Sequence, residues 1–139
     1  MAFKKIFLSI LAFWWPALIL HQAQACICTF VVYTLCQKYD MSDAVMHGTP
    51  LSRNVTGDDA TYTLDIITLY KEEENVTYSD EISFNTPAST DDCGVTLSIG
   101  KEYLIGLRDS DDDGVYTLSS CHGLYEPWST EIEEEVDEC

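Results

Sequence analysis

Basic residues are scarce in this chain. Its 139 residues include seven Lys+Arg against 24 Asp+Glu, which gives a formal net charge of −17 at pH 7. A surface this acidic repels nucleic acid and anionic membrane surfaces. We therefore expect neither nucleic acid nor a membrane as a partner, and favour a partner that is neutral, basic or a cation.

Motifs of enzyme active sites are also missing. Only three histidines occur, and neither His47 nor His122 lies in a recognisable nucleophile or zinc-hydrolase motif. The many carboxylates do not single out an acid–base pair for glycoside hydrolysis. We therefore predict that the protein is not an enzyme and has no cofactor of its own. His47 and His122 are expected to be surface or turn residues.

Long apolar runs are confined to the N-terminus. Lys4 and Lys5 precede the run 6–20, and the stretch His21-Gln22-Ala23-Gln24-Ala25 ends in a small-x-small pattern. The run is shorter than the roughly 20 residues that a membrane-spanning helix needs. The pattern is typical of a cleaved signal peptide over residues 1–25, with a mature protein that begins at Cys26.

Removal of 25 residues leaves 114, which is enough for one domain over residues 26–139. That domain keeps five basic against 24 acidic side chains, a balance of −19. We expect it to be secreted, extracellular and monomeric. Asn54-Val55-Thr56 and Asn75-Val76-Thr77 are N-glycosylation sequons, which predict surface positions for Asn54 and Asn75.

The cysteines contain no C-x-x-C pair of the kind that many structural zinc sites use. All six follow the leader, and an even number in a small secreted domain predicts three disulfides. Zinc ligation is the less favoured alternative, and the residues alone leave several pairings open. The six are Cys26, Cys28, Cys36, Cys93, Cys121 and Cys139.

Most of the mature chain has the composition of β-strands. Residues 60–70 are rich in β-branched and aromatic side chains, and residues 81–86 alternate between polar and apolar before Pro87. Residues 101–107 and 115–120 are expected to pair as a hairpin across the turn 109–114. A further strand is expected over 39–47, ending at Gly48-Thr49-Pro50.

Two segments have helical character, 30–38 and 129–138, the second with an N-cap serine and early acids. Five short strands with flanking helices predict a mainly β domain, a five-stranded OB-fold β-barrel.

The run Asp109-x-Asp111-x-Asp113-Gly114 copies half of a calcium loop. It lacks the later glutamate, and an acidic hairpin turn explains it more simply.

The order of several motifs resembles the amino-terminal, netrin-like domain of the tissue inhibitors of metalloproteinases. That family begins its mature chain with Cys-x-Cys, as here in Cys26-Ile27-Cys28, and the resemblance extends over nearly the whole mature chain. The other matching segments are the third cysteine Cys36 leading to Gly48, Tyr62 to Lys71, the connector Thr86 to Gly94, Tyr103-Leu104-Ile105-Gly106, and the last hairpin from Asp113 through Cys121 to Pro127-Trp128.

The resemblance implies three disulfides, Cys26–Cys93, Cys28–Cys121 and Cys36–Cys139. It also implies that the α-amino group and carbonyl oxygen of Cys26 bind the catalytic zinc of a matrix metalloproteinase-type endopeptidase, while Ile27 enters the primary specificity pocket. The contact surface would be an inhibitory ridge made of the N-terminal segment and the connector: Cys26, Ile27, Cys28, Thr29, Ala88, Ser89, Thr90, Asp91, Asp92 and Cys93.

The chain also departs from the family pattern. Ile27 replaces the usual Thr or Ser, Asp91 and Asp92 make the connector more acidic, and the segment from Cys28 to Cys36 is shorter. These changes leave a second function open, that of a non-inhibitory netrin-like module that binds a receptor or an extracellular-matrix protein.

Overall fold

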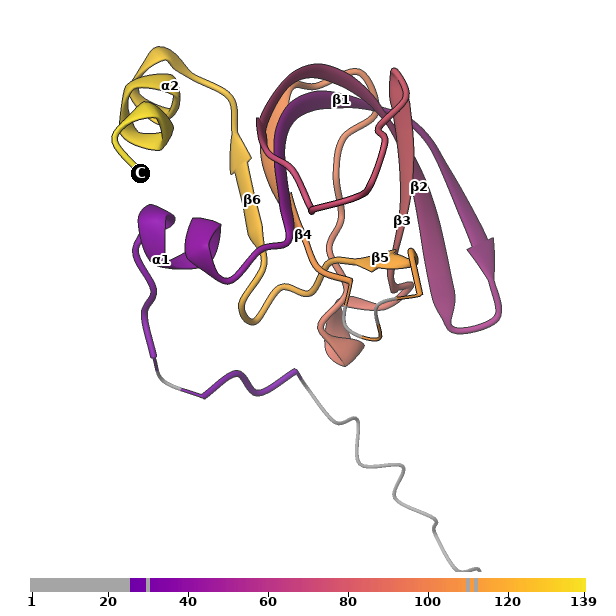
Figure 1. Ribbon diagram of the computed structural model, residues 1–139. Helices are drawn as coiled ribbons and strands as arrows, with labels where there is room; N and C mark the ends of the chain where they lie inside the picture. The colour runs from indigo at the N-terminus through magenta and orange to yellow at the C-terminus, as the bar shows by residue number, and fades with distance from the viewer. Residues whose placement is uncertain (1–25, 30, 110, 112) are drawn as a thin grey trace, which may run out of the picture.

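The computed structural model describes residues 26–29, 31–109, 111 and 113–139, so the predicted signal peptide lies outside the described residues. Figure 1 shows a strongly curved sheet with two short helices beside it. In chain order the elements are α1 (Leu35–Asp40), β1 (Ala44–Thr56), β2 (Asp59–Lys71), β3 (Glu81–Pro87), the 3₁₀ turn η1 (Thr90–Asp92), β4 (Tyr103–Leu107), β5 (Tyr116–Thr117), β6 (Leu124–Pro127) and α2 (Thr130–Asp137).

The strands form one sheet in the order β5-β3-β2-β1-β4-β6. All neighbours are antiparallel except β3 and β5. Arg108, directly after β4, forms an antiparallel bridge with Thr117 of β5. Because β5 also pairs with β3, this bridge joins the two sides of the curved sheet and closes β1, β2, β3, β5 and β4 into a small barrel.

The predicted mainly β, OB-type fold with flanking helices and three disulfides is confirmed, with six strands instead of five. The additional strand is β6, which pairs with β4 on the side away from β1. Its four residues end in Pro127 and are too short to show a strand pattern. Proline is tolerated there because β6 forms an edge of the sheet.

The strand predicted over 39–47 is wrong in both bounds. Residues up to Asp40 belong to α1, and β1 continues through Gly48-Thr49-Pro50 to Thr56. The pairing with β2 shifts register between His47 and Gly48 and again between Pro50 and Ser52. These irregularities accommodate the proline inside the strand. A Cβ at position 48 would lie 2.6 Å from the backbone oxygen of Asp65, so glycine permits the close approach of β2.

The predicted hairpin between 101–107 and 115–120 is also largely wrong. Among the described residues, the Arg108–Thr117 bridge is the one strand pairing found between these parts of the chain, while β4 pairs along its length with β1 and β6. β5 runs parallel to β3 instead. A pattern of apolar residues identifies a strand but does not select its neighbour, because several strands offer equivalent edges.

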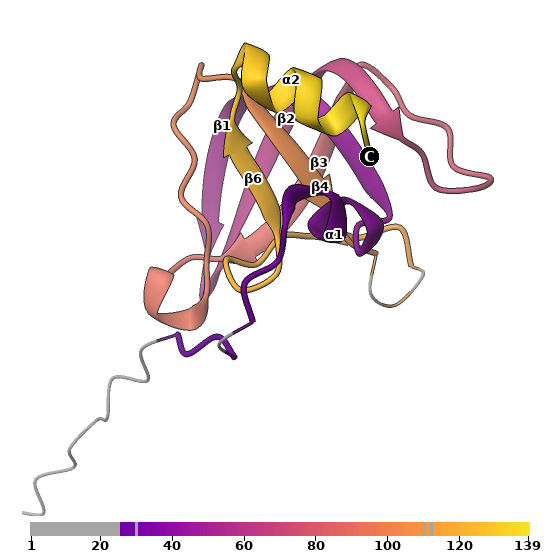
Figure 2. The same ribbon diagram turned by 90° about the vertical axis from the view of Figure 1, so that its left-hand side faces the viewer.

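The helix predicted over 30–38 begins later than expected, at Leu35, and Phe30 lies outside the described residues. Thr34 caps it through a capping box with Gln37. The C-terminal helix is confirmed, with Ser129 as its N-cap. Figure 2 shows α1 and α2 together on one side of the barrel, next to β6.

Two apolar cores hold these layers together. The barrel interior contains Tyr62, Leu64, Phe84, Ile105 and Leu107 among others. A second cluster between the sheet and the helices contains Leu35, Val45, Leu104, Leu124 and Val136. All five residues of β4 are buried, which is why β4 is apolar throughout whereas β3 alternates.

The prediction of a surface position for His47 is wrong. It is 7% exposed in β1, and its ring stacks on Trp128 at a centroid distance of 3.7 Å. His122 does lie in a turn, as expected.

None of the helices among the described residues has the length and apolar character that crossing a membrane requires.

Candidate functional site

Two disulfides hold the N-terminal segment against the barrel. Cys26 is bonded to Cys93 and Cys28 to Cys121, with Cα separations of 5.0 and 5.1 Å. The third, Cys36–Cys139, joins α1 to the residues after α2. These are the pairs that the family resemblance implies. Each spans 67 residues or more, so each restricts the unfolded chain considerably.

The sulfur atoms of Cys26, Cys28, Cys93 and Cys121 form one cluster, all within 4.8 Å of one another. Such a group of four could hold a metal only as thiolates. All four are consumed in disulfides, and none of the six cysteines is free. The four cysteines are therefore oxidised to two disulfides in this structure, so they do not act as zinc ligands in it.

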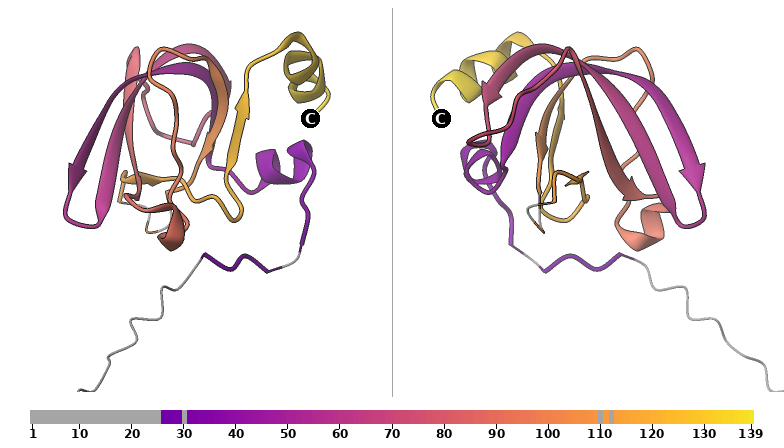
Figure 3. Two further views of the ribbon diagram at one scale, coloured as in Figure 1. Left: turned by 180° about the vertical axis from the view of Figure 1, so that it is seen from behind. Right: turned by 45° about the vertical axis from the view of Figure 1, so that its right-hand side comes forward.

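The short segment between these two staples is exposed. Cys26 and Cys28 are half-buried, whereas the side chain of Ile27 is 84% exposed. Among the described residues, no backbone group of Cys26, Ile27 or Cys28 has a hydrogen-bond partner. Figure 3 shows the segment crossing one end of the barrel as an extended chain, outside the sheet. A fixed main chain thus presents a free apolar side chain and unpaired polar backbone groups.

The connector after β3 forms the other part of the ridge. The Ser89 hydroxyl accepts a hydrogen bond from the N–H of Asp91 at 3.1 Å and so caps η1. Cys93 then adopts the left-handed conformation, with φ 68°. Its carbonyl oxygen accepts the N–H of Ser120 at 3.0 Å. This turn directs Cys93 toward Cys26, and Figures 1 and 2 place η1 and the N-terminal segment at the same end of the barrel.

The hairpin of β1 and β2 also supports the connector, which the sequence did not indicate. The Arg53 guanidinium donates to the carbonyl oxygen of Ala88 at 3.0 Å, and the N–H of Ala88 donates to the carbonyl oxygen of Asp58 at 2.8 Å. These contacts join residues 35 and 30 positions apart in the sequence and depend on how the hairpin is placed by the pairing of β2 with β3. No local pattern in the sequence could have revealed them.

The ridge is acidic on its connector side. Thr90, Asp91 and Asp92 are exposed, whereas Ala88, Ser89 and Cys93 are half-buried. The Arg53 guanidinium is bonded to a neutral carbonyl and forms no ion pair with either aspartate. A partner that contacts this turn would therefore meet two uncompensated carboxylates.

The predicted glycosylation positions are not among the ridge residues. Asn54 in β1 and Asn75 after β2 are exposed. Asn75 lies in a loop that side-chain hydrogen bonds hold in place. The Tyr116 hydroxyl donates to the carboxylate of Glu73 at 2.8 Å and lies 2.9 Å from the Tyr78 hydroxyl. Burial, followed by these two hydrogen bonds, raises the pKa of Tyr116 well above its usual range.

The acidic turn at Asp109 is organised by its own backbone. The Asp109 carboxylate is buried, and its two oxygens accept the N–H groups of Asp113 and Gly114 at 3.1 and 2.8 Å. Within the described part of this turn, no three carboxylates converge as metal ligands. The geometry supports a structural turn.

The described residues thus form a small disulfide-stapled barrel with an exposed N-terminal segment. A family model described as tissue inhibitor of metalloproteinase matches residues 20–133. The chain therefore belongs to the tissue inhibitor of metalloproteinase family. Among curated proteins, none matches this chain.

Proposed function

We propose that this protein is a secreted inhibitor of zinc metalloendopeptidases of the matrix metalloproteinase type, and that its inhibitory group is the processed N-terminus at Cys26. The observation that carries the proposal is the arrangement of Cys26, Ile27 and Cys28. Both cysteines are anchored by disulfides, and the residue between them is 84% exposed.

Cleavage after Ala25 would give Cys26 a free α-amino group. A neutral amine and the carbonyl oxygen of the same residue form a five-membered chelate with zinc, and they would occupy the position of the zinc-bound water in the proteinase. An α-amino group has a pKa of about 8 in general, so deprotonation at neutral pH costs little free energy. The zinc belongs to the target enzyme.

Ile27 would enter the primary specificity pocket of the proteinase. Its side chain is apolar and β-branched, so it loses little side-chain entropy when it is buried. Burial of a side chain of this size contributes about 1.5–3 kcal/mol. The two staples reduce the ordering cost of the backbone, because the segment is already fixed before binding.

Asp91 and Asp92 favour a second candidate function. Two exposed carboxylates beside the N-terminal segment would repel an acidic proteinase surface and attract a basic one. A netrin-like module that binds a basic receptor or matrix protein without inhibition would use the same face. The test is an inhibition panel on protein with a verified Cys26 terminus. Inhibition of at least one matrix-type proteinase supports the first function, and binding without inhibition supports the second.

A further inference from the structure

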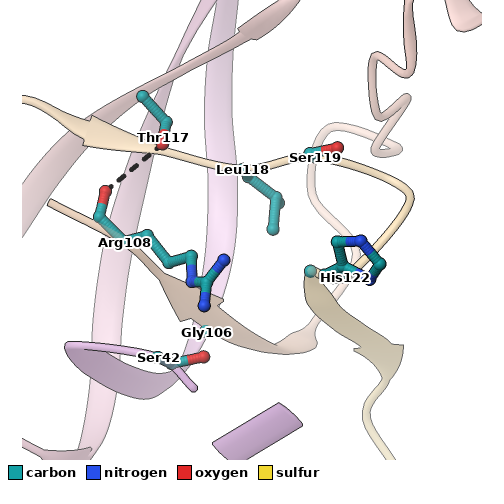
Figure 4. Close-up of a pocket in the computed structure, with 8 residues that line it drawn as sticks. Ser42, Gly106, Arg108, Thr117, Leu118, Ser119 and His122 are labelled. Atoms are coloured by element: carbon teal, nitrogen blue, oxygen red, sulfur yellow. Dashed lines mark hydrogen bonds between the residues drawn. The ribbon is translucent and has the colours of Figure 1, made fainter. Parts of the chain in front are cut away.

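A pocket of about 160 Å³ lies where the barrel closes, and none of the ridge residues lines it. Its inner wall comes from buried residues, Gly106 of β4, Leu118 and Gly123. Its rim carries Arg108 and His122, which Figure 4 shows on two sides of the pocket. Pockets for drug-sized ligands measure roughly 300–1,000 Å³, so this one fits a small ion or a single side-chain group.

Two polar side chains of the pocket, Arg108 and Ser119, have donor groups to spare, whereas the hydroxyls of Ser42 and Thr117 donate to backbone carbonyl oxygens. The Arg108 side chain is fixed by its Nε, which donates to the carbonyl oxygen of Met41 at 2.8 Å. Among the described residues, its terminal nitrogens have no hydrogen-bond or ion-pair partner. The Ser119 hydroxyl oxygen accepts the N–H of Cys121 at 3.3 Å, which leaves its proton available to a ligand.

The ring of His122 also lines the pocket. Its Nδ1 is buried, with no hydrogen-bond partner within the described part of the chain, so this nitrogen offers no surface to an occupant of the pocket. The ring is held by the edge-on ring of Tyr33, at a centroid distance of 5.4 Å. His122 therefore contributes a fixed aromatic wall to the pocket.

No carboxylate is among the described residues that line this pocket. This is unusual for a chain in which acidic residues outnumber basic ones 24 to seven. A planar guanidinium with free terminal nitrogens matches the two oxygens of a carboxylate in a bidentate pair. The pocket therefore combines positive charge, a planar fork and a volume that suits one carboxylate group.

We propose that the pocket between Arg108 and His122 is a carboxylate-binding site, filled by a small carboxylic acid or by an acidic side chain of a docked protein. Arg108 would supply the bidentate contact, Ser119 would donate one hydrogen bond, and the ring of His122 would form a wall of the pocket. The proposal does not depend on inhibition of a proteinase, because the pocket lies in the barrel seam and includes no residue of the ridge.

The test is a titration of the ¹⁵N-labelled, disulfide-bonded protein with sodium acetate, followed by amide NMR and matched for ionic strength with sodium chloride. We expect saturable shifts at Ser119, His122 and Gly123. Arg108→Gln should weaken binding by at least about tenfold, because a charge-assisted pair is lost. Lys101→Gln removes the same charge from an exposed position outside the pocket and should leave binding unchanged.

Further arms separate the alternatives. Because Arg108 also bonds to Met41, Ser119→Ala provides a second variant that removes the other proposed donor and should still weaken binding severalfold. If acetate binds but a glutamate with blocked main-chain amino and carboxyl groups does not, the ligand is a small free acid. If the blocked glutamate binds as tightly as acetate, the ligand is an acidic side chain of a protein. Absence of saturation, tighter binding of phosphate or sulfate than of acetate, or unchanged binding in both pocket variants would overturn the proposal.

Discussion

The sulfur of Cys26 lies 3.4 Å from the sulfur of Cys121, although the two belong to different disulfides. Cys26 is therefore fixed at a point where the connector and the loop before β6 meet. Since Ser120 also donates to the carbonyl oxygen of Cys93, both anchor points belong to one hydrogen-bonded unit. The consequence is a main chain that is held rigidly on both sides of Ile27.

Ile27→Gly should weaken inhibition without changing stability. The substitution removes an exposed side chain, so the free energy of unfolding should stay the same. Loss of its burial in the proteinase pocket corresponds to about 2 kcal/mol, or roughly a 30-fold higher Ki. Ki values and urea unfolding curves measure the two effects. Ile99→Gly changes the same residue type at an exposed position outside the ridge, and its Ki should equal that of the parent protein. An unchanged Ki for Ile27→Gly would contradict the role of Ile27.

Replacement of both Cys36 and Cys139 by serine should separate stability from inhibition. This disulfide joins residues 103 positions apart, for which the chain-entropy estimate is about 4.7 kcal/mol. We expect a lower urea midpoint and, under conditions where the variant is folded, an unchanged Ki. The pair Cys26→Ser and Cys93→Ser should instead abolish inhibition. Equal loss of inhibition in both pairs would show that the staples act only through global stability.

The raised pKa of Tyr116 should make the folded protein less stable at alkaline pH. Burial and the bonds to Tyr78 and Glu73 raise its pKa in the folded state, above the value of 10.0 that represents the unfolded chain. Below pH 10 both states keep the proton. Above it the unfolded state ionises first, so stability should fall by up to about 1.4 kcal/mol per pH unit for this group. Urea unfolding between pH 9 and about 11 measures this slope, and Tyr116→Phe should reduce it. An identical slope in the variant would refute the assignment.

Asp109→Ala should destabilise the turn after β4, independently of calcium. The carboxylate accepts two backbone N–H groups, which would lose their partner in the variant. The expected loss is about 1–3 kcal/mol in the free energy of unfolding. Millimolar calcium should not shift the melting temperature of the parent protein, since a ligand stabilises only what it binds. A calcium-dependent increase in melting temperature that disappears in Asp109→Ala would show that the turn is a calcium site.

The sequence predicted most of the fold where the pattern was strong and local. The strand over 60–70 lies within β2, and Ser129 caps α2 as its sequence indicates. The errors concern pairing: β5 joins β3, and β6 was missed because four residues ending in Pro127 carry too little pattern. His47 was misplaced because a polar residue within a strand gives no information about a stacking partner 81 positions away.

The site was predicted unevenly, for a similar reason. The position of Cys26-Ile27-Cys28 after a predicted leader pointed to a special N-terminus, and the family resemblance supplied its disulfide partners. Two features arise only when the barrel folds. They are the hydrogen bond from Arg53 to Ala88 and the pocket between Arg108 and His122. Residues brought together in this way leave no periodicity or spacing in the sequence.

The central claim is that a free α-amino group at Cys26 is the inhibitory group, and an N-terminal extension tests it most directly. The Ki against a matrix-type metalloproteinase should be measured for protein that begins at Cys26 and for protein with one additional alanine. Intact mass and circular dichroism should show the same three disulfides and fold in both. We predict tight inhibition by the first and loss of inhibition in the second, because the extension displaces the amine from the zinc. Equal inhibition by both forms, or none by either across a panel of such proteinases, would contradict the account.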